Sequence, residues 1–151
     1  MTMKKFFTKI VLCAAAVLAL AACSNPEDEK INIISGEWHY TATESGVQID
    51  VYLGLYADYT FDLYQKIGDG PHYLYKGKYN FDGQLLSGTY SDYTPWAHDY
   101  QVTRSGSSLT LTSITSPDYS VTYSKESIPE SVKTHYMSAT KAEGEAPMPI
   151  L

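Results

Sequence analysis

Cysteine is scarce in this sequence: its 151 residues include only Cys13 and Cys23. So few thiols exclude a disulfide framework and a cluster of thiolate metal ligands. Basic residues are also few, with 11 Lys and Arg against 17 Asp and Glu. Such an acidic balance repels phosphate backbones, which argues against a nucleic-acid partner.

Signatures of catalysis are missing as well. The sequence has no Gly-x-Ser-x-Gly element and no glycine-rich phosphate loop. None of its four histidines forms a pair with the spacing of a preformed metal site, and we expect each to be solvated or singly hydrogen bonded: His39, His72, His98 and His135. Asp92 and Asp99 flank a loop that we interpret as part of the rim of the fold rather than as a glycosidase pair. The sequence therefore predicts no enzyme activity, no metal and no cofactor.

The one long apolar run, Ile10–Leu20, follows three lysines and is too short to cross a bilayer core of about 30 Å as a helix. This pattern is typical of an export signal. The run ends in Leu20-Ala21-Ala22-Cys23, which resembles the lipobox of bacterial lipoproteins. The resemblance implies that residues 1–22 are removed, Cys13 among them, and that Cys23 becomes the lipidated first residue. Two or three acyl chains anchor a protein stably in a membrane.

The residues after Cys23 bear on the address of the protein. An Asp directly after the lipidated cysteine resembles an inner-membrane retention signal, but this chain has Ser24 at that position. The resemblance therefore favours an outer-membrane lipoprotein, on the periplasmic face or the cell surface. The acidic run Glu27–Glu29 resembles short signals for surface display. The alternative is that residues 23–33 form a polar, solvated tether. Without the three leader lysines, eight basic residues remain against 17 acidic ones, a net charge of −9 with neutral histidines.

Hydrophobic residues of the mature chain repeat with a period of two. In residues 47–55, for example, Val51, Leu53 and Leu55 alternate with Asp50, Tyr52 and Gly54. Eight such segments, separated by turn-forming residues, predict strands at about 36–43, 47–55, 59–64, 73–81, 86–90, 100–102, 109–111 and 121–123. We therefore predict an all-β fold, an eight-stranded antiparallel up-and-down meander. It closes into a barrel or folds as a sandwich, and closure removes exposed strand edges.

A short helix is expected at the end of this domain, which spans residues 34–137. Ser127 and Glu130 have the spacing of a capping box, and Ile128, Val132 and Tyr136 repeat at intervals of four residues. Such a stripe packs against the barrel wall or mouth. Residues 138–151 contain a glycine and two prolines, and we interpret them as a disordered tail.

Gly36-Glu37-Trp38 opens the first strand and resembles the Gly-x-Trp signature of the lipocalins. Over residues 34–126 the chain is similar to the lipocalin-like domain of small Gram-negative lipoproteins. The resemblance implies a barrel whose closed end is filled by Trp38, with Lys125 as the late basic residue that packs across its ring. The family's Thr-Asp-Tyr turn is absent, and Ser105-Gly106-Ser107 stands in its place.

Tyrosine is abundant, with 14 copies, and many lie at inward positions of the predicted strands. Six tyrosines are candidates to line a pocket for a small hydrophobic or amphipathic ligand: Tyr40, Tyr75, Tyr79, Tyr90, Tyr100 and Tyr123. The alternative is an interior filled by these rings alone. Gly77 and Gly88 also face inward and leave room for either a neighbouring aromatic ring or a ligand.

A second hypothesis is recognition of a glycan or a protein at the outer surface. Its candidate residues are Tyr93 and Trp96 in a loop, together with the outward-facing Tyr52, Tyr56 and Tyr64. A cavity of several hundred Å³ inside the barrel would favour ligand binding. A filled barrel with exposed aromatic rings outside would favour surface recognition.

Overall fold

The computed structural model describes residues 33–141 and 146–151. The expected export signal, Cys23 and nearly all of the tether therefore lie outside the described residues. Within the described ranges, no helix combines the length and the apolar character needed to span a bilayer.

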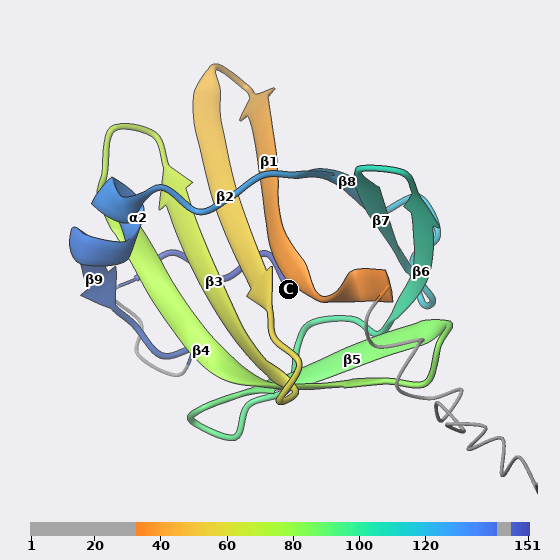
Figure 1. The fold of residues 1–151 in the computed structure, drawn as a ribbon. Coiled ribbons are helices and arrows are strands. Elements are labelled where there is room, and N and C mark those ends of the chain that lie inside the picture. The colour runs from red at the N-terminus through yellow and green to blue at the C-terminus, as the bar shows by residue number, and fades with distance from the viewer. Residues whose placement is uncertain (1–32, 142–145) are drawn as a thin grey trace, which may run out of the picture.

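Eight antiparallel strands form a closed barrel (Figure 1). Their bounds are β1 (Gly36–Glu44), β2 (Val47–Leu55), β3 (Thr60–Ile67), β4 (His72–Phe81), β5 (Leu85–Tyr90), β6 (Tyr100–Ser105), β7 (Ser108–Ser113) and β8 (Ser120–Lys125). Each strand pairs with the next along the chain, and β1 closes the ring on β8 through Trp38 opposite Lys125 and His39 opposite Ser124. The predicted eight-stranded up-and-down barrel is confirmed, and the sandwich alternative is wrong.

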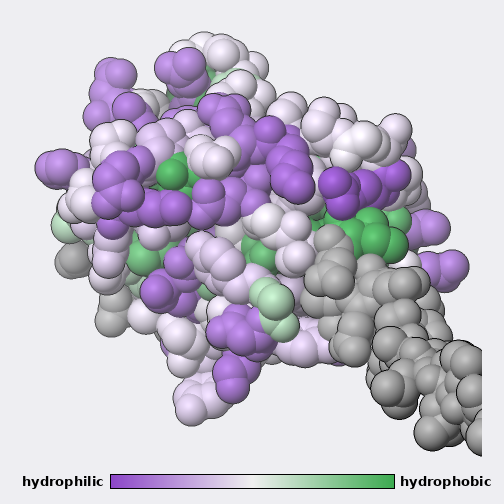
Figure 2. Space-filling model, in the orientation of Figure 1, coloured by the Kyte–Doolittle hydropathy of each residue, from purple (hydrophilic) through white to green (hydrophobic). Residues whose placement is uncertain are grey.

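The apolar side of each strand faces the interior, as the period of two predicts. Val51, Leu53, Phe61 and Leu111 are at most 1% exposed, and all belong to one central cluster. Hydrophilic residues cover most of the outer face seen in Figure 2, where hydrophobic residues show only in small, separate areas. Burial of this interior is the main stabilising contribution to the fold.

Two inward glycines make room for neighbouring atoms rather than for open space. A Cβ on Gly88 would lie 2.1 Å from the ring of Trp96, and a Cβ on Gly77 would lie 2.1 Å from the Thr89 carbonyl oxygen and 2.7 Å from Phe61. Trp96 reaches the interior because its loop folds back, with the Trp96 amide donating to the Gly88 carbonyl at 2.9 Å. Its ring packs edge-on against Phe61 at 5.0 Å. The expectation that Trp96 serves surface recognition is therefore wrong, since it is 5% exposed.

The single turn of helix α2 (Glu130–Thr134) covers part of the outer barrel wall. Ile128 and Val132 pack there against Tyr52, Tyr64 and Leu74. The two tyrosines are thus buried under the helix and do not offer the exposed rings that their outward positions predicted.

The predicted capping box at Ser127 is wrong. The residue before the helix is Pro129, and it makes no side-chain cap bond with any described residue. Glu37 of β1 instead fixes the segment on both sides of the helix start, because its carboxylate accepts a hydrogen bond from the Ile128 amide at 2.8 Å and pairs with Lys133 Nζ at 2.7 Å. A contact distant in sequence therefore holds the helix against the barrel.

After the helix, β9 (Tyr136–Ser138) runs parallel to the start of β4. Tyr136 therefore lies in a strand and not on the helix, and its ring meets Tyr64 edge-on at 5.6 Å. The Ala139 amide then donates to the Leu74 carbonyl at 3.0 Å. Residues 146–151 lie inside the ring of strands, where Figure 1 places the C-terminus. The prediction of a disordered tail is wrong for these residues, because they bury apolar side chains in the core.

Trp38 lies in the core and is fully buried. Its ring nitrogen donates to the Ile34 carbonyl at 2.9 Å. Lys125 Nζ stands 5.9 Å from the centre of the ring, as the lipocalin resemblance implies, but the guanidinium carbon of Arg104 is closer, at 5.2 Å. Two cations thus cover the ring, and the sequence analysis identified only one of them.

Replacing Trp38 with alanine is expected to lower the free energy of unfolding by about 3–5 kcal/mol, because it leaves a large cavity in the core. Urea denaturation of the mature chain measures this loss. Tyr93→Ala provides a matched control, since Tyr93 is 88% exposed and its ring is not part of the core. Equal urea midpoints for the two variants would show that Trp38 contributes little to the core.

Candidate functional site

The predicted pocket tyrosines meet inside the barrel, although not all of them turn toward the same place. Tyr75, Tyr90, Tyr100 and Tyr123 come from four strands, and each is at most 3% exposed. Tyr79 is buried too, but its hydroxyl donates to the Tyr56 carbonyl at 2.7 Å. Tyr40 is only partly buried and tilts against Tyr123 at 5.8 Å. Four of the six candidates thus form a central group.

This central group surrounds residues 146–151, named here the C-terminal segment. The Tyr90 hydroxyl donates to the main-chain oxygen of Leu151 at 2.7 Å, and Tyr75 donates to the Pro147 carbonyl. Tyr100 and Tyr119 both donate to the Ile150 carbonyl, at 3.5 and 3.1 Å. The Leu151 side chain is 2% exposed. The interior therefore holds an apolar stretch of its own chain through oxygen atoms of the main chain.

Gln65 of β3 completes this site, and the sequence analysis did not identify it. Its amide nitrogen donates to the Met148 carbonyl at 2.8 Å, and its oxygen accepts from the Ile150 amide at 2.8 Å. The side chain is one of two polar residues in the described part of the chain that are fully buried. The available signal was its inward position after Phe61 and Leu63, since a polar residue at a core position needs a partner.

The C-terminal segment does not satisfy every polar group around it. The hydroxyl of Tyr123 is buried and has no hydrogen-bond partner among the described residues. The space between Tyr123, Leu111 and Leu151 leaves no room for a water molecule. An unpaired buried hydroxyl of this kind costs about 1–3 kcal/mol.

The tyrosine hydroxyls of the interior are protonated at physiological pH. Burial raises the pKa of Tyr75 to about 12 and raises the pKa values of Tyr90 and Tyr100 further. Burial also raises the pKa of Tyr123 well above its ordinary value. All four hydroxyls thus keep their protons, and those of Tyr75, Tyr90 and Tyr100 act as hydrogen-bond donors. Protonated hydroxyls of this kind suit main-chain oxygen atoms as acceptors.

A polar cluster on the outer wall joins residues that the sequence did not associate. His39 Nε2 lies 2.6 Å from Asp50, its Nδ1 lies 2.8 Å from Glu126, and His72 Nε2 lies 3.0 Å from the other oxygen of Asp50. The His39 ring stacks on Tyr52, its cross-strand neighbour, at 4.1 Å. The His39 ring therefore makes two hydrogen bonds, whereas the sequence predicted a solvated ring or a single hydrogen bond. No group of described residues has the geometry of a metal site.

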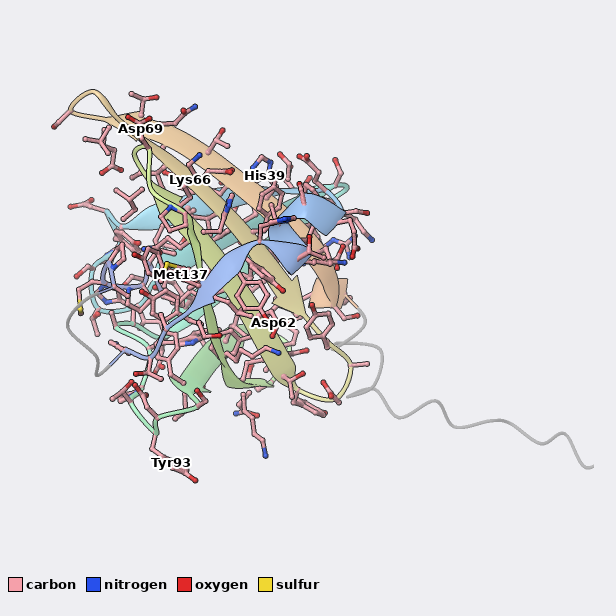
Figure 3. The ribbon with its side chains drawn as sticks, turned by 90° about the vertical axis from the view of Figure 1, so that its left-hand side faces the viewer. His39, Asp62, Lys66, Asp69, Tyr93 and Met137 are labelled. Atoms are coloured by element: carbon pink, nitrogen blue, oxygen red, sulfur yellow. The ribbon has the colours of Figure 1, made fainter. Side chains whose placement is uncertain are left out.

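A groove of about 480 Å³ is lined by residues of β3, β4 and β5, among them the charged Asp62, Lys76 and Lys78 and the buried rings of Phe61 and Tyr90. Tyr93 stands at its edge and projects from the tip of its loop (Figure 3). The Tyr93 backbone is held at a φ of 67°, and its amide donates to the Tyr90 carbonyl at 2.9 Å. A non-glycine residue in this left-handed region indicates a turn imposed by its surroundings. Tyr93 is therefore an exposed ring on an ordered turn.

The barrel thus presents two candidate binding surfaces, the tyrosine-lined interior and the groove beside Tyr93. No family model, curated protein or solved structure matches this chain.

The polar cluster predicts a pH dependence of stability. Partial burial lowers the pKa of His39, but its bonds to Asp50 and Glu126 outweigh this and raise the pKa above the ordinary 6.5. The contribution of His39 is therefore complete below pH 6.5 and is lost as the pH rises through the folded-state pKa. Urea denaturation over this range is expected to show the loss for the wild-type chain and a flatter profile for His39→Gln. His135→Gln, at an exposed position, is the matched control; an equal flattening by both variants would contradict the assignment.

Proposed function

We propose that this protein is a non-enzymatic binding lipoprotein of the bacterial outer membrane, whose lipocalin-like barrel takes a small hydrophobic or amphipathic ligand. The lipobox-like segment that ends at Cys23 supports the membrane anchor. The closed eight-stranded barrel and the buried Trp38 at the Gly-x-Trp position support the lipocalin likeness.

One observation carries the ligand-binding proposal: neutral donors from several strands converge on one apolar segment inside the barrel. The segment enters from outside the strand meander, after β9, and is not a part of the barrel wall. An amphipathic molecule with a carbonyl or hydroxyl acceptor would meet the same donors and the same apolar walls. The interior thus has the chemistry of a ligand site that an internal segment occupies.

A second candidate function, recognition of a glycan or a protein at the cell surface, is favoured by the exposed ring of Tyr93. The ring is 88% exposed and stands beside a groove lined by Asp62, Lys76 and Lys78. Aromatic rings beside polar side chains suit the faces and hydroxyl groups of sugars. The filled interior agrees with this alternative as well, because a filled barrel needs no internal ligand.

A thermal-shift screen separates the two functions. The mature chain is tested against hydrophobic and amphipathic compounds and against oligosaccharides. A ligand at 100 times its dissociation constant stabilises the fold by about 2.7 kcal/mol. We expect hydrophobic compounds to raise the melting temperature, and Tyr90→Phe to reduce that rise because it removes a donor.

Tyr93→Ala is the matched control, because it leaves the interior unchanged. A shift with oligosaccharides alone, lost in Tyr93→Ala, would support the surface function and contradict the interior site. If hydrophobic compounds raise the melting temperature equally in wild type and Tyr90→Phe, the Tyr90 hydroxyl does not donate a hydrogen bond to the ligand.

The anchor has its own test. Cys23→Ser removes the thiol that the lipid modification requires, so the variant is expected to move from the detergent phase to the aqueous phase in detergent phase separation of whole cells. Ser24→Ala, which retains the thiol, is the control. Wild-type protein in the aqueous phase would contradict lipidation at Cys23.

A further inference from the structure

Gln65 carries an inference about the kind of ligand that the interior takes. We infer that the barrel is a peptide-binding site for an extended, apolar, proline-containing segment, and that residues 146–151 are the occupant supplied by the chain itself. The inference rests on the proposed ligand-binding function and narrows its ligand class from hydrophobic molecules in general to peptides.

Gln65 binds a main-chain donor and a main-chain acceptor of the C-terminal segment at once. Its amide contacts the Met148 carbonyl and the Ile150 N–H, each at 2.8 Å. This is the pattern by which a peptide pairs with an amide group along an extended chain. A hydrocarbon in the same place would leave both ends of this buried side chain unpaired, which is unfavourable. The site therefore discriminates in favour of a peptide.

The lining of the site presents mainly hydrogen-bond donors to the C-terminal segment. Five groups donate to the segment: the hydroxyls of Tyr75, Tyr90, Tyr100 and Tyr119, and the Gln65 amide. Four successive or nearly successive main-chain oxygen atoms receive these bonds, those of Pro147, Met148, Ile150 and Leu151. Proline has no N–H, so Pro147 and Pro149 add acceptors without adding donors that need a partner. A lining rich in donors thus fits a proline-containing peptide.

The site buries some side chains of the C-terminal segment and leaves others exposed. Pro149 and Leu151 are buried, Ile150 between them is only partly buried, and Met148 before them is 70% exposed. We therefore expect a bound peptide to vary freely at the position of Met148 and to need apolar residues at the positions of Pro149 and Leu151. This alternation is the usual way in which an extended peptide is bound beside a sheet.

The C-terminal segment does not pair with every polar group of the site. It leaves the fully buried hydroxyl of Tyr123 without a partner among the described residues, in a space that has no room for water. A peptide that brought an acceptor to Tyr123 would gain a hydrogen bond that the C-terminal segment lacks. An occupant that leaves such a group unpaired can be replaced by a better one.

Self-occupation has a quantitative consequence. The chain before the segment is fixed near the site, with Lys141 Nζ donating to the Pro95 carbonyl at 2.6 Å. A tethered segment competes at an effective concentration in the range of about 1 mM. If the segment sequence has an intrinsic dissociation constant of about 10 µM for the open site, any competing peptide binds the intact chain on the order of 100-fold more weakly than the open site.

The test compares the intact mature chain with an open variant that lacks residues 146–151. The probe is the synthetic peptide Ala-Pro-Met-Pro-Ile-Leu with a fluorophore at its N-terminus, and its binding is followed by fluorescence anisotropy. We expect the open variant to bind the peptide, and the intact chain to bind it on the order of 100-fold more weakly. Gln65→Leu in the open variant is expected to abolish peptide binding, and Tyr93→Ala in the open variant is expected to leave it unchanged.

A fluorescent fatty acid, added to the same proteins, separates failure of this inference from failure of the proposed function. If the open variant binds the fatty acid but not the peptide, the peptide inference is wrong and the ligand-binding function stands. If it binds neither, both are wrong. If Gln65→Leu leaves peptide binding unchanged, the main-chain hydrogen bonds of Gln65 do not determine peptide binding, and that part of the inference is wrong.

A second protein covers the case in which the open variant does not fold. A protease recognition sequence is inserted after Gly144 in the full chain, which folds with its segment in place and is cut afterwards. Exchange of the cut segment for the labelled peptide supports the inference, with excess unlabelled peptide reversing the signal. A cut barrel that stays folded and takes up no labelled peptide would overturn it.

Discussion

The tyrosine hydroxyls that face the barrel interior constrain the rest of the structure, because each of them needs an acceptor in a space closed to water. Eight antiparallel strands use their backbone groups to pair with one another, so the barrel wall has few acceptors left for Tyr75, Tyr90 and Tyr100. The main-chain oxygen atoms of residues 147–151 meet this demand. The position of the C-terminal segment thus follows from the chemistry of the lining as much as from its own apolar character.

Packing around this site depends on a few small residues. Gly88 admits the ring of Trp96, and Gly77 admits Phe61 and the backbone of its neighbours, so bulky rings fill the interior beside the segment. On the opposite side of the wall, α2 covers Tyr52 and Tyr64. The barrel therefore buries aromatic rings on both faces of its sheet, which leaves Tyr93 as the ring most exposed among the residues considered for recognition.

The sequence predicted the barrel well because alternation is a local signal. Phe61, Tyr79 and Leu111 were placed inside by period alone, and the structure agrees. The contacts that build the candidate sites were missed because they join distant segments. His39 and Asp50 both face outward in the pattern, but only the pairing register brings them together. Prolines and a glycine near the end of the chain are typical of disorder, and no local signal shows that this segment has a cavity to enter.

The filled interior brings the two functional hypotheses closer together than the sequence suggested. A cavity and a filled barrel were treated as alternatives, but a barrel filled by a segment from outside its own wall has both properties, since the space exists and has an occupant. The occupant stabilises the fold through the burial of Leu151 and the bonds of Gln65, and it also sets the affinity that any other ligand must exceed. Under the proposed function, stability and ligand affinity are therefore linked through the same hydrogen bonds, so a change that loosens the segment raises affinity for an added ligand at the expense of the unliganded fold.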